Sequence, residues 1–236
     1  MAYGIVGLGK RYGDKAVLDG IDIDIDDGSV CVVLGPSGCG KTTLLNILSG
    51  IDSDFSGSIH GFQGTRPGYA FQEDRLLPWK SALDNVALVL EGPYGKAQAK
   101  CKALEALSSV GLGADAHKTP NALSGGMRKR VALARAMAFP SGLLLMDEPF
   151  SSLDLKTRIA VMDLFIGLRK ASGKTAILVT HDVREAIYLG DRIYCLSDKP
   201  SRVRDRIDLD LPRDARAYAS PAAAAIEARL YASIVG

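Results

Sequence analysis

The sequence predicts an α/β fold: a mixed sheet with flanking helices, a small antiparallel β part and an inserted all-helical subdomain. Patterns typical of strands and helices alternate at both ends of the 236-residue chain, whereas residues 73–139 carry only helix patterns. We therefore expect a single domain, residues 1–236, made of an α/β core (residues 1–72 and 140–236) and a helical subdomain (residues 73–139).

Short apolar runs indicate the strands of the core. The run IDIDID alternates with the period of a strand that has one buried face, and VCVVLG is a continuous β-branched run typical of a strand buried on both faces. By the same reasoning we expect strands at residues 21–26, 30–35, 142–148, 175–180, 193–197 and 203–211.

Start and stop signals indicate the helices. Ser81 and Asp84 have the spacing of a capping box, and Gly92 marks the end of the helix that they open. We expect helices at residues 41–49, 81–92, 96–111, 124–140, 156–170 and 183–190, and one terminal helix in the alanine-rich segment that begins at Asp214.

The composition excludes several classes of protein. Apolar residues make up 47% of the chain and charged residues 24%, as in ordinary globular proteins, and a net charge of +2 gives no strong attraction to nucleic acid. No apolar run approaches the roughly 18 residues that a membrane-spanning helix needs, and the N-terminus lacks the pattern of a signal peptide. The four cysteines have no metal-ligand spacing, which favours a reducing compartment.

The basic run Arg128, Lys129 and Arg130 does not change the conclusion about nucleic acid. Consecutive residues of a helix point in different directions, so these side chains cannot form one flat basic patch. We expect a solvated or ion-paired helix face and no nucleic-acid partner.

The segment GPSGCGKT predicts a phosphate-binding loop, and hence a P-loop NTPase core. It matches the pattern G-x-x-x-x-G-K-[ST] and lies between a predicted buried strand and a predicted helix, as that loop requires. Its glycines let successive backbone N–H groups turn inward around an anion, and the following helix adds the positive end of its dipole. Lys41 would reach the β- and γ-phosphates, and the Thr42 hydroxyl would hold Mg²⁺. The predicted nucleotide-binding residues are Gly35, Pro36, Ser37, Gly38, Cys39, Gly40, Lys41, Thr42 and Thr43.

The segment GLLLMDEP supplies carboxylates for the same chemistry. An apolar strand that ends in Asp147 and Glu148 brings both to the carboxyl edge of the sheet, where open α/β sheets bind ligands. We expect Asp147 to bind Mg²⁺ through water, and Glu148 to act as the general base that polarises the attacking water.

Further motifs indicate the family. LSGGM at residues 123–127 is similar to the LSGGQ signature of the ATP-binding subunits of ABC transporters, SSLD at 151–154 resembles their D-loop, and VTHD at 179–182 resembles their switch-histidine loop. Gln72, which ends YAFQ, resembles the Q-loop glutamine, and Tyr12 resembles the aromatic residue that stacks on adenine. The motifs occur in the family's order and cover most of the chain.

The signature segment also has a physical interpretation of its own. Ser124, Gly125 and Gly126 open a predicted helix, and a helix N-terminus binds anions. The chain thus carries two separate phosphate-binding ends. In the family these ends meet across a head-to-tail homodimer, so the resemblance implies ATP held between Lys41 of one protomer and the signature segment of the other.

The resemblance implies roles for four further residues. Gln72 would bind Mg²⁺ and sense the γ-phosphate, and His181 would contact the γ-phosphate and steady the attacking water. Asp154 would couple the two ATP sites of the dimer, and Tyr12 would stack on the adenine.

Two features depart from the family's pattern. Met127 stands in place of the signature glutamine and cannot make its polar contacts. The segment between the phosphate-binding loop and Gln72 is shorter than usual, which trims the antiparallel sheet that helps to support the adenine.

Two outputs are open for such an ATPase. The segments QEDRLLPW and KPSRVRDRIDLDLPR resemble importers of the nitrate, sulfonate and taurine group, which implies uptake of a small solute through a separate permease, with an extracytoplasmic solute-binding protein as an indirect partner. The subunit would then lie peripherally on the cytoplasmic face of the cell membrane. The alternative is a soluble ABC-type ATPase that acts on DNA or ribosomes; such relatives usually carry coiled-coil insertions, zinc modules or two fused cassettes, and none is present here.

The apolar cluster from Leu76 to Trp79 indicates where the permease would dock. It contains the only tryptophan of the chain, on a predicted loop beside charged residues, and aromatic anchors ringed by charge are typical of interface hot spots. We expect permease subunits to dock near Gln72–Trp79. The other interpretation is that Trp79 packs internally against the helix at residues 82–91.

Overall fold

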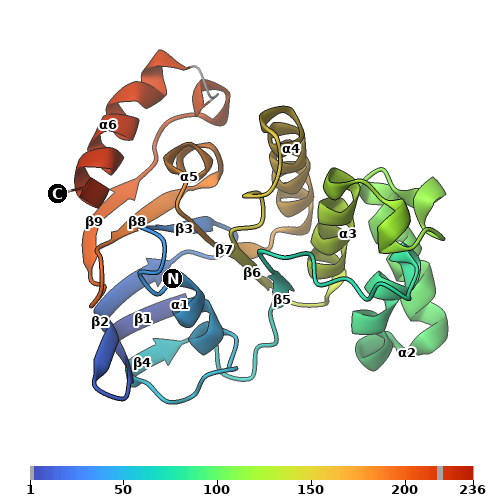
Figure 1. Ribbon diagram of the computed structural model, residues 1–236, viewed down its shortest axis with the longest axis horizontal. Coiled ribbons are helices and arrows are strands. Elements are labelled where there is room, and N and C mark those ends of the chain that lie inside the picture. Colours follow the sequence, from blue (N-terminus) through green and yellow to red (C-terminus); the bar gives the residue numbers. More distant parts are fainter. Residues whose placement is uncertain (1–2, 217–219, 236) are drawn as a thin grey trace. The chain divides into compact units, whose positions relative to one another are not determined.

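The computed structural model describes residues 3–216 and 220–235. The chain divides into two compact units, the first made of Met1–Thr65 and Thr175–Gly236 and the second of Arg66–Lys174 (Figure 1). This division by packing differs from the predicted domain boundaries after residues 72 and 139, which stay a prediction.

The first unit contains the predicted small antiparallel sheet. Strands β1 (Tyr3–Tyr12) and β2 (Lys15–Ile25) form a hairpin that pairs Tyr12 with Lys15, and β4 (Ser56–His60) pairs antiparallel with the other edge of β1. Because side chains alternate between the faces of a strand, the isoleucines of IDIDID share one face. All three are buried, as expected: Ile21, Ile23 and Ile25.

The first unit also contains a mixed sheet. Strand β3 (Val30–Leu34) lies between β7 (Thr175–Thr180) and β8 (Arg192–Leu196) in parallel register, and β9 (Val203–Asp208) pairs antiparallel with β8. Every residue of β3 and β7 is buried, which explains why the sequence shows continuous apolar runs there. Strand β9 ends at Asp208, three residues before the predicted end at residue 211.

Three α-helices of the described residues belong to this unit. Helix α1 (Lys41–Leu48) follows β3, and α5 (Val183–Leu189) follows β7, as predicted. The prediction of one terminal helix from Asp214 is wrong: a short 3-10 helix, η3 (Arg213–Arg216), precedes α6 (Pro221–Val235), and residues 217–219 lie outside the described chain. Proline is well suited to the first turn of α6, because that turn needs no backbone N–H donor.

The second unit combines a parallel strand pair with helices. Strands β5 (Gly68–Ala70) and β6 (Leu143–Asp147) pair in parallel, and α4 (Leu155–Ser172) follows β6. A Cβ at Gly68 would lie 2.2 Å from the backbone oxygen of Ala136, so only glycine allows β5 to approach the helix that carries Ala136 this closely.

The helical part of this unit has its own apolar core. Helices α2 (Ala82–Ser109) and α3 (Gly125–Ala138) lie side by side (Figure 1), joined through the 3-10 helices η1 (Gly113–Asp115) and η2 (Pro120–Ala122). Complete burial of one leucine or valine side chain stabilises a fold by about 1.5–3 kcal/mol. Six such side chains of this core are at most 2% exposed: Val86, Leu90, Leu107, Val110, Leu112 and Val131.

Helix α2 corrects one predicted boundary. The helices expected at residues 81–92 and 96–111 form a single kinked element, and the break lies at Gly95 (φ 74°, ψ 161°) rather than at Gly92. Ser81 caps the helix as predicted, because its hydroxyl accepts a hydrogen bond from the backbone N–H of Asp84 at 3.0 Å. No helix in the described part of the chain is long and apolar enough to cross a membrane.

Candidate active site

The loop between β3 and α1 has the backbone of an anion cradle. Gly38 (φ 78°) and Gly40 (φ 117°) both have the positive φ that favours glycine. A Cβ at Gly40 would also lie 2.9 Å from a methyl carbon of Val17 on β2. The glycines that the motif requires are therefore needed for conformation and, at Gly40, for packing against the hairpin.

Lys41 lies across this loop. Its side chain is buried, and its ammonium donates hydrogen bonds to the backbone oxygens of Gly35 and Pro36, both at 2.9 Å. A buried cation needs acceptors, and these two carbonyls hold the ammonium at the cradle. Thr42 is exposed and Thr43 is half-buried on the first turn of α1. The Lys41 ammonium is thus available for phosphate oxygens, and the Thr42 hydroxyl for a divalent cation.

His181 is brought to the same loop. The backbone N–H of Gly35 donates to the carbonyl of Thr180, the residue before His181, at 3.3 Å. The Thr180 hydroxyl donates to Glu185 at 2.8 Å, and the Asp182 carboxylate caps α5 by accepting from the N–H groups of Arg184 and Glu185. His181 itself is exposed, on a segment that is fixed on both sides.

Ser201 is a supporting residue that sequence reasoning missed. It is fully buried, its hydroxyl donates to the backbone oxygen of Cys39, and its N–H donates to the backbone oxygen of Val17 at 2.9 Å. Ser201, in the segment after β8, therefore connects the phosphate-binding loop at Cys39 to the β-hairpin at Val17. In the sequence, Ser201 belongs to the segment KPSR, whose resemblance to importer ATPases does not indicate this contact.

The second unit carries the predicted carboxylates. Asp147 ends β6 and is 7% exposed, and Glu148 follows with φ 40°, a conformation that few non-glycine residues adopt. The carbonyl of Glu148 accepts from the Ser151 hydroxyl at 3.0 Å and from the Ser151 N–H at 3.3 Å. Strained backbone of this kind is common at functional sites, where the surrounding structure holds it.

Gln72 lies at the same edge as Asp147. Strands β5 and β6 are parallel and pair Ala70 with Met146, so the residues that follow each strand end leave the sheet together. Gln72 is exposed there. Burial, and next the nearby Asp147 carboxylate, raise the pKa of the Tyr69 hydroxyl.

Basic residues of α3 hold the loop that follows Gln72. The Lys129 ammonium donates to the backbone oxygen of Gln72 and lies 3.1 Å from a carboxylate oxygen of Asp74, and Arg128 lies 3.4 Å from the other oxygen of that carboxylate. Arg135 donates to the backbone oxygens of Asp74 and Arg75, both at 2.8 Å. The expectation of an ion-paired face is thus confirmed for Arg128 and Lys129, but Lys129 is buried and not solvated.

The signature segment and the predicted D-loop meet in this unit. Ser124 caps α3 by accepting from the N–H of Met127 at 3.2 Å, and the Met127 side chain packs against the helical core. A Cβ at Gly126 would lie 2.7 Å from the Thr157 side chain, and the N–H of Thr157 donates to Asp154, the N-cap of α4, at 3.1 Å. Hydrogen bonds from Thr157 also lower the pKa of Asp154. Methionine at position 127 therefore preserves the cap that presents the signature N–H groups.

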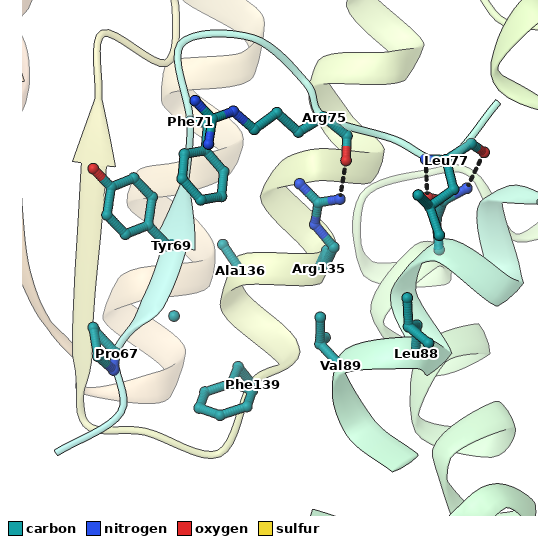
Figure 2. A pocket seen from close by; sticks show the side chains of 12 residues that line it. Pro67, Tyr69, Phe71, Arg75, Leu77, Leu88, Val89, Arg135, Ala136 and Phe139 are labelled. Atoms are coloured by element: carbon teal, nitrogen blue, oxygen red, sulfur yellow. Dashed lines mark hydrogen bonds between the residues drawn. The ribbon is translucent and has the colours of Figure 1, made fainter. Parts of the chain in front are cut away.

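An apolar groove opens beside the Gln72 loop. It has a volume of about 340 Å³, and Figure 2 shows its wall of stacked rings, with Tyr69 and Phe71 at a centroid distance of 4.1 Å and the Arg75 guanidinium 4.2 Å from the Phe71 ring. Apolar residues of α2 and α3 and the following residue complete the lining: Leu88, Val89, Ala136 and Phe139.

The loop that contains Leu77 and Trp79 borders this groove; its backbone is held by a buried side chain, and its tryptophan is exposed. Asn85 is 2% exposed and bonds both backbone groups of Leu77, accepting from its N–H at 2.7 Å and donating to its carbonyl at 3.2 Å. Trp79 is 74% exposed. The interpretation that Trp79 packs internally is therefore wrong, because most of its ring lies in solvent.

Within each unit, the structure gathers predicted residues. The first unit joins the segment Gly35–Lys41 to the loop of His181, and carries Tyr12 on the neighbouring hairpin. The second unit groups Gln72 with Asp147 and Glu148, and connects Ser124–Gly126 with Asp154. Among the described residues, no group of three or more His, Cys, Asp or Glu side chains forms a metal site by itself.

Comparison with known proteins shows which family the chain is similar to. The family model described as "ABC transporter" matches residues 18–151. The chain is 42% identical to an aliphatic sulfonates import ATP-binding protein of Burkholderia lata over 94% of this chain and 82% of that protein. It is 45% identical to a protein of the same description from Ralstonia nicotianae, over 86% of this chain and 72% of that protein.

Solved structures show the same fold. A dimeric structure of a bacterial ABC transporter cassette covers 89% of this chain and is itself covered completely, with a TM-score of 0.77 and 32% sequence identity. A second structure, described as the dimeric post-hydrolysis state of an ATP-binding cassette bound to ADP and phosphate, matches with a TM-score of 0.76 and 31% identity over the same shares. The predicted fold class is confirmed.

Proposed function

The chain belongs to the ABC transporter family of ATP-binding proteins, and from that premise we propose that it is the ATP-hydrolysing subunit of an importer for a small sulfonated or similar anionic solute. The ATPase assignment is supported by the position of Lys41 at the loop, where Gly38 and Gly40 have the positive φ that a phosphate-binding loop needs. The importer assignment is supported by the aliphatic sulfonates import proteins, which match most of this chain.

The chemistry that we propose is attack of water on the γ-phosphorus of ATP, with ADP as the leaving group. Glu148 takes the proton of the water, and His181 holds the water and a γ-phosphate oxygen. Lys41 and the N–H groups of the cradle hold the β- and γ-phosphates as charge develops on them.

The predicted Mg²⁺ ligands fit that ion. The hydroxyl of Thr42, the amide of Gln72 and the carboxylate of Asp147 all offer oxygen, which Mg²⁺ prefers, and few protein ligands are expected because phosphates and water supply the rest. When bound, Mg²⁺ neutralises charge on the phosphates and orients them. These three residues would hold the ion.

We infer that the working unit is a homodimer. The two solved cassettes named above are dimers, and each protomer of this chain has a cradle and a separate signature helix whose Ser124 cap leaves N–H groups for an anion. In a head-to-tail dimer, Ser124, Gly125 and Gly126 close the site of the partner subunit. Asp154, which contacts the signature helix through Thr157, couples the two sites.

We further propose that permease subunits dock at the groove beside the Gln72 loop. Its rings, its half-exposed Leu88 and the exposed Trp79 offer an apolar surface, and Arg75 offers a cation at the rim. Exposed aromatic side chains next to arginine are typical of binding hot spots. The subunit would then lie peripherally on the cytoplasmic face of the membrane, and an extracytoplasmic binding protein would deliver the solute.

The alternative output, a soluble ABC-type ATPase acting on DNA or ribosomes, has no observation in its favour. The relatives reported above are import ATP-binding proteins. A pull-down from cell extract would distinguish the two outputs, since recovery of DNA or ribosomes without any permease would reverse the assignment.

Transport in liposomes tests the proposal. Liposomes that contain the permease encoded by a neighbouring gene, together with this subunit and an internal or external solute-binding protein, should take up an alkanesulfonate only when ATP is supplied on the side of the subunit. Lys41→Ala should abolish uptake. Uptake that is unchanged without ATP, or unchanged by Lys41→Ala, would contradict the proposed function.

A further inference from the structure

A buried lysine lies next to the aromatic side chain that is predicted to carry the adenine. Lys10 stands two residues before Tyr12 on β1 and is 4% exposed. Its ammonium donates to carboxylate oxygens of Asp52 at 2.8 Å and of Asp54 at 3.3 Å, and also to the backbone oxygen of Asp54. All three N–H groups thus have acceptors, as burial of a charge requires.

Asp52 connects this ammonium to Tyr12. Its Oδ1 accepts from Lys10 and from the N–H of Asp54, the latter at 3.1 Å, while its Oδ2 accepts from the Tyr12 hydroxyl at 3.0 Å. The Lys10 ammonium also lies 4.8 Å from the centre of the Tyr12 ring, within the range of a cation–π contact. The ring is therefore held both at its hydroxyl and at its face.

Lys10 and Asp52 each stabilise the charged form of the other. The hydrogen bond to Asp52 is the main cause that raises the pKa of Lys10, and the hydrogen bond from Lys10 is the main cause that lowers the pKa of Asp52. Both groups therefore carry full charge at neutral pH, where the contact to Tyr12 is needed.

Tyr12 nevertheless stays open to solvent. It is 51% exposed, although its hydroxyl donates to Asp52 and its ring contacts the Lys10 ammonium. A surface side chain normally keeps its rotamer freedom, and a ligand that binds to it must bear the cost of ordering it. A ring that is already ordered and half exposed is a prepared platform for a flat ligand, and nucleobases stack on such rings.

The hairpin brings this platform close to the phosphate cradle. Tyr12 pairs with Lys15 across the turn, and Val17, two residues along β2, is the residue against which a Cβ at Gly40 would collide. Two strand residues span about 7 Å. The strand that pairs with Tyr12 thus contacts the cradle two residues further along.

Asp52 lies between α1 and β4, and from there it supplies the carboxylate that accepts from the Tyr12 hydroxyl. We propose that Lys10 and Asp52 are positioning residues for nucleotide recognition: they lock the Tyr12 ring in the orientation on which the base of a nucleoside triphosphate stacks. The inference rests on the proposed function, because it needs the triphosphate to be held by the cradle. Lys10 and Asp52 act through Tyr12 and need not touch the nucleotide.

Binding of ATP and of inorganic tripolyphosphate, both with Mg²⁺, tests this proposal, because only ATP has a base. In calorimetric titrations of the full chain, Lys10→Met and Asp52→Asn should each weaken ATP binding about tenfold and change tripolyphosphate binding by less than about twofold. Tyr12→Phe keeps the ring and loses only its anchor, so it should weaken ATP binding less than Lys10→Met does. Lys15→Met is the matched control: it removes an exposed lysine from the same hairpin and should change neither affinity.

Equal weakening of both ligands in Lys10→Met and Asp52→Asn would show that the pair merely supports the cradle, and would overturn the proposal. Unchanged ATP binding in both variants would overturn it as well. If Lys10→Met does not fold, Asp52→Asn and Tyr12→Phe decide, since both keep the size of the side chain. Wild-type protein that binds neither ligand would instead refute the proposed function itself, and these two failures are thereby distinguishable.

Discussion

The ammonium of Lys129 lies 3.1 Å from the carboxylate of Asp74 and donates a hydrogen bond to the backbone oxygen of Gln72. One buried side chain of the signature helix thus holds the residue that is proposed to bind Mg²⁺. Arg75 lines the groove, and its backbone oxygen accepts from Arg135, so α3 also holds the proposed docking surface. Displacement of the loop by a docked partner would therefore act on the signature helix and on Gln72 together.

Substitution of Lys129 tests this connection. Lys129→Met should lower kcat for ATP about tenfold with little change in KM, because Gln72 loses its support while the cradle is intact. The free energy of unfolding should fall by about 1–3 kcal/mol, as expected when a buried charged hydrogen bond is lost. Steady-state kinetics and urea unfolding measure the two effects.

The matched control is Arg130→Met. Arg130 is the next residue of α3, but it donates to the backbone oxygen of Val110, away from the Gln72 loop. It should lower stability and leave kcat unchanged. Equal kcat values for Lys129→Met and Arg130→Met would contradict the role given to Lys129.

Ser201 should matter for affinity rather than for turnover. Ser201→Ala leaves the carbonyl of Cys39 without its buried donor, which should cost about 1–3 kcal/mol of stability and loosen the cradle. We expect weaker ATP binding by about threefold to tenfold, with kcat retained at saturating ATP. Ser197→Ala, on the same loop but half-buried, is the control; a loss of affinity as large as that of Ser201→Ala would argue against a specific contact.

The parts of the fold that were predicted correctly are those that local patterns determine. Continuous apolar runs indicated β3, β6 and β7, and the hydroxyl caps at Ser81 and Ser124 marked two helix starts. The three-residue strand β5 was not predicted, because it is too short to show a period. Both Gly92 and Gly95 can adopt a positive φ, so the sequence does not determine that the break lies at Gly95.

The supporting residues of the site could not be predicted for a different reason. Lys129 stands in a basic run and has the sequence pattern of a surface lysine, yet the approach of the Gln72 loop buries it. Lys10 and Asp52 are 42 residues apart in the chain and meet only because the hairpin packs beside the segment after α1. Residues that carry chemistry belong to motifs, whereas residues that hold them are selected by tertiary contact.

The buried thiol of Cys31 predicts an alkaline loss of stability. Burial raises the pKa of Cys31 to about 12, whereas a thiol in an unfolded chain ionises near about 8.5. A raised folded-state pKa stabilises the fold below the unfolded value, and this contribution is lost as pH rises toward 12. Between about pH 9 and pH 11, the stability gap between wild type and Cys31→Ala should therefore shrink by about 1.4 kcal/mol per pH unit.

Urea unfolding at several pH values measures that gap. Cys101→Ala removes an exposed thiol on α2 and serves as the control. A gap for Cys31→Ala that stays constant from pH 8 to about pH 11 would contradict the assigned cause.

Trp79 should matter for the permease and not for the fold. Because 74% of its surface is exposed, Trp79→Ala should change the free energy of unfolding by less than about 0.5 kcal/mol. It should reduce ATP-driven uptake in liposomes about tenfold or more while the isolated subunit keeps its ATPase rate. The control Ile51→Ala removes another apolar side chain, which is 69% exposed, and should leave uptake intact. Equal uptake by both variants would show that Trp79 is not part of the docking surface.

The rate of ATP hydrolysis by Glu148→Gln tests the central claim most directly. Glutamine keeps the shape of the side chain at this strained position but cannot accept the proton of the attacking water. The account predicts that the variant binds ATP as the wild type does, forms a stable dimer in its presence, and hydrolyses it at least about a hundredfold more slowly. Hydrolysis at the wild-type rate would contradict the account.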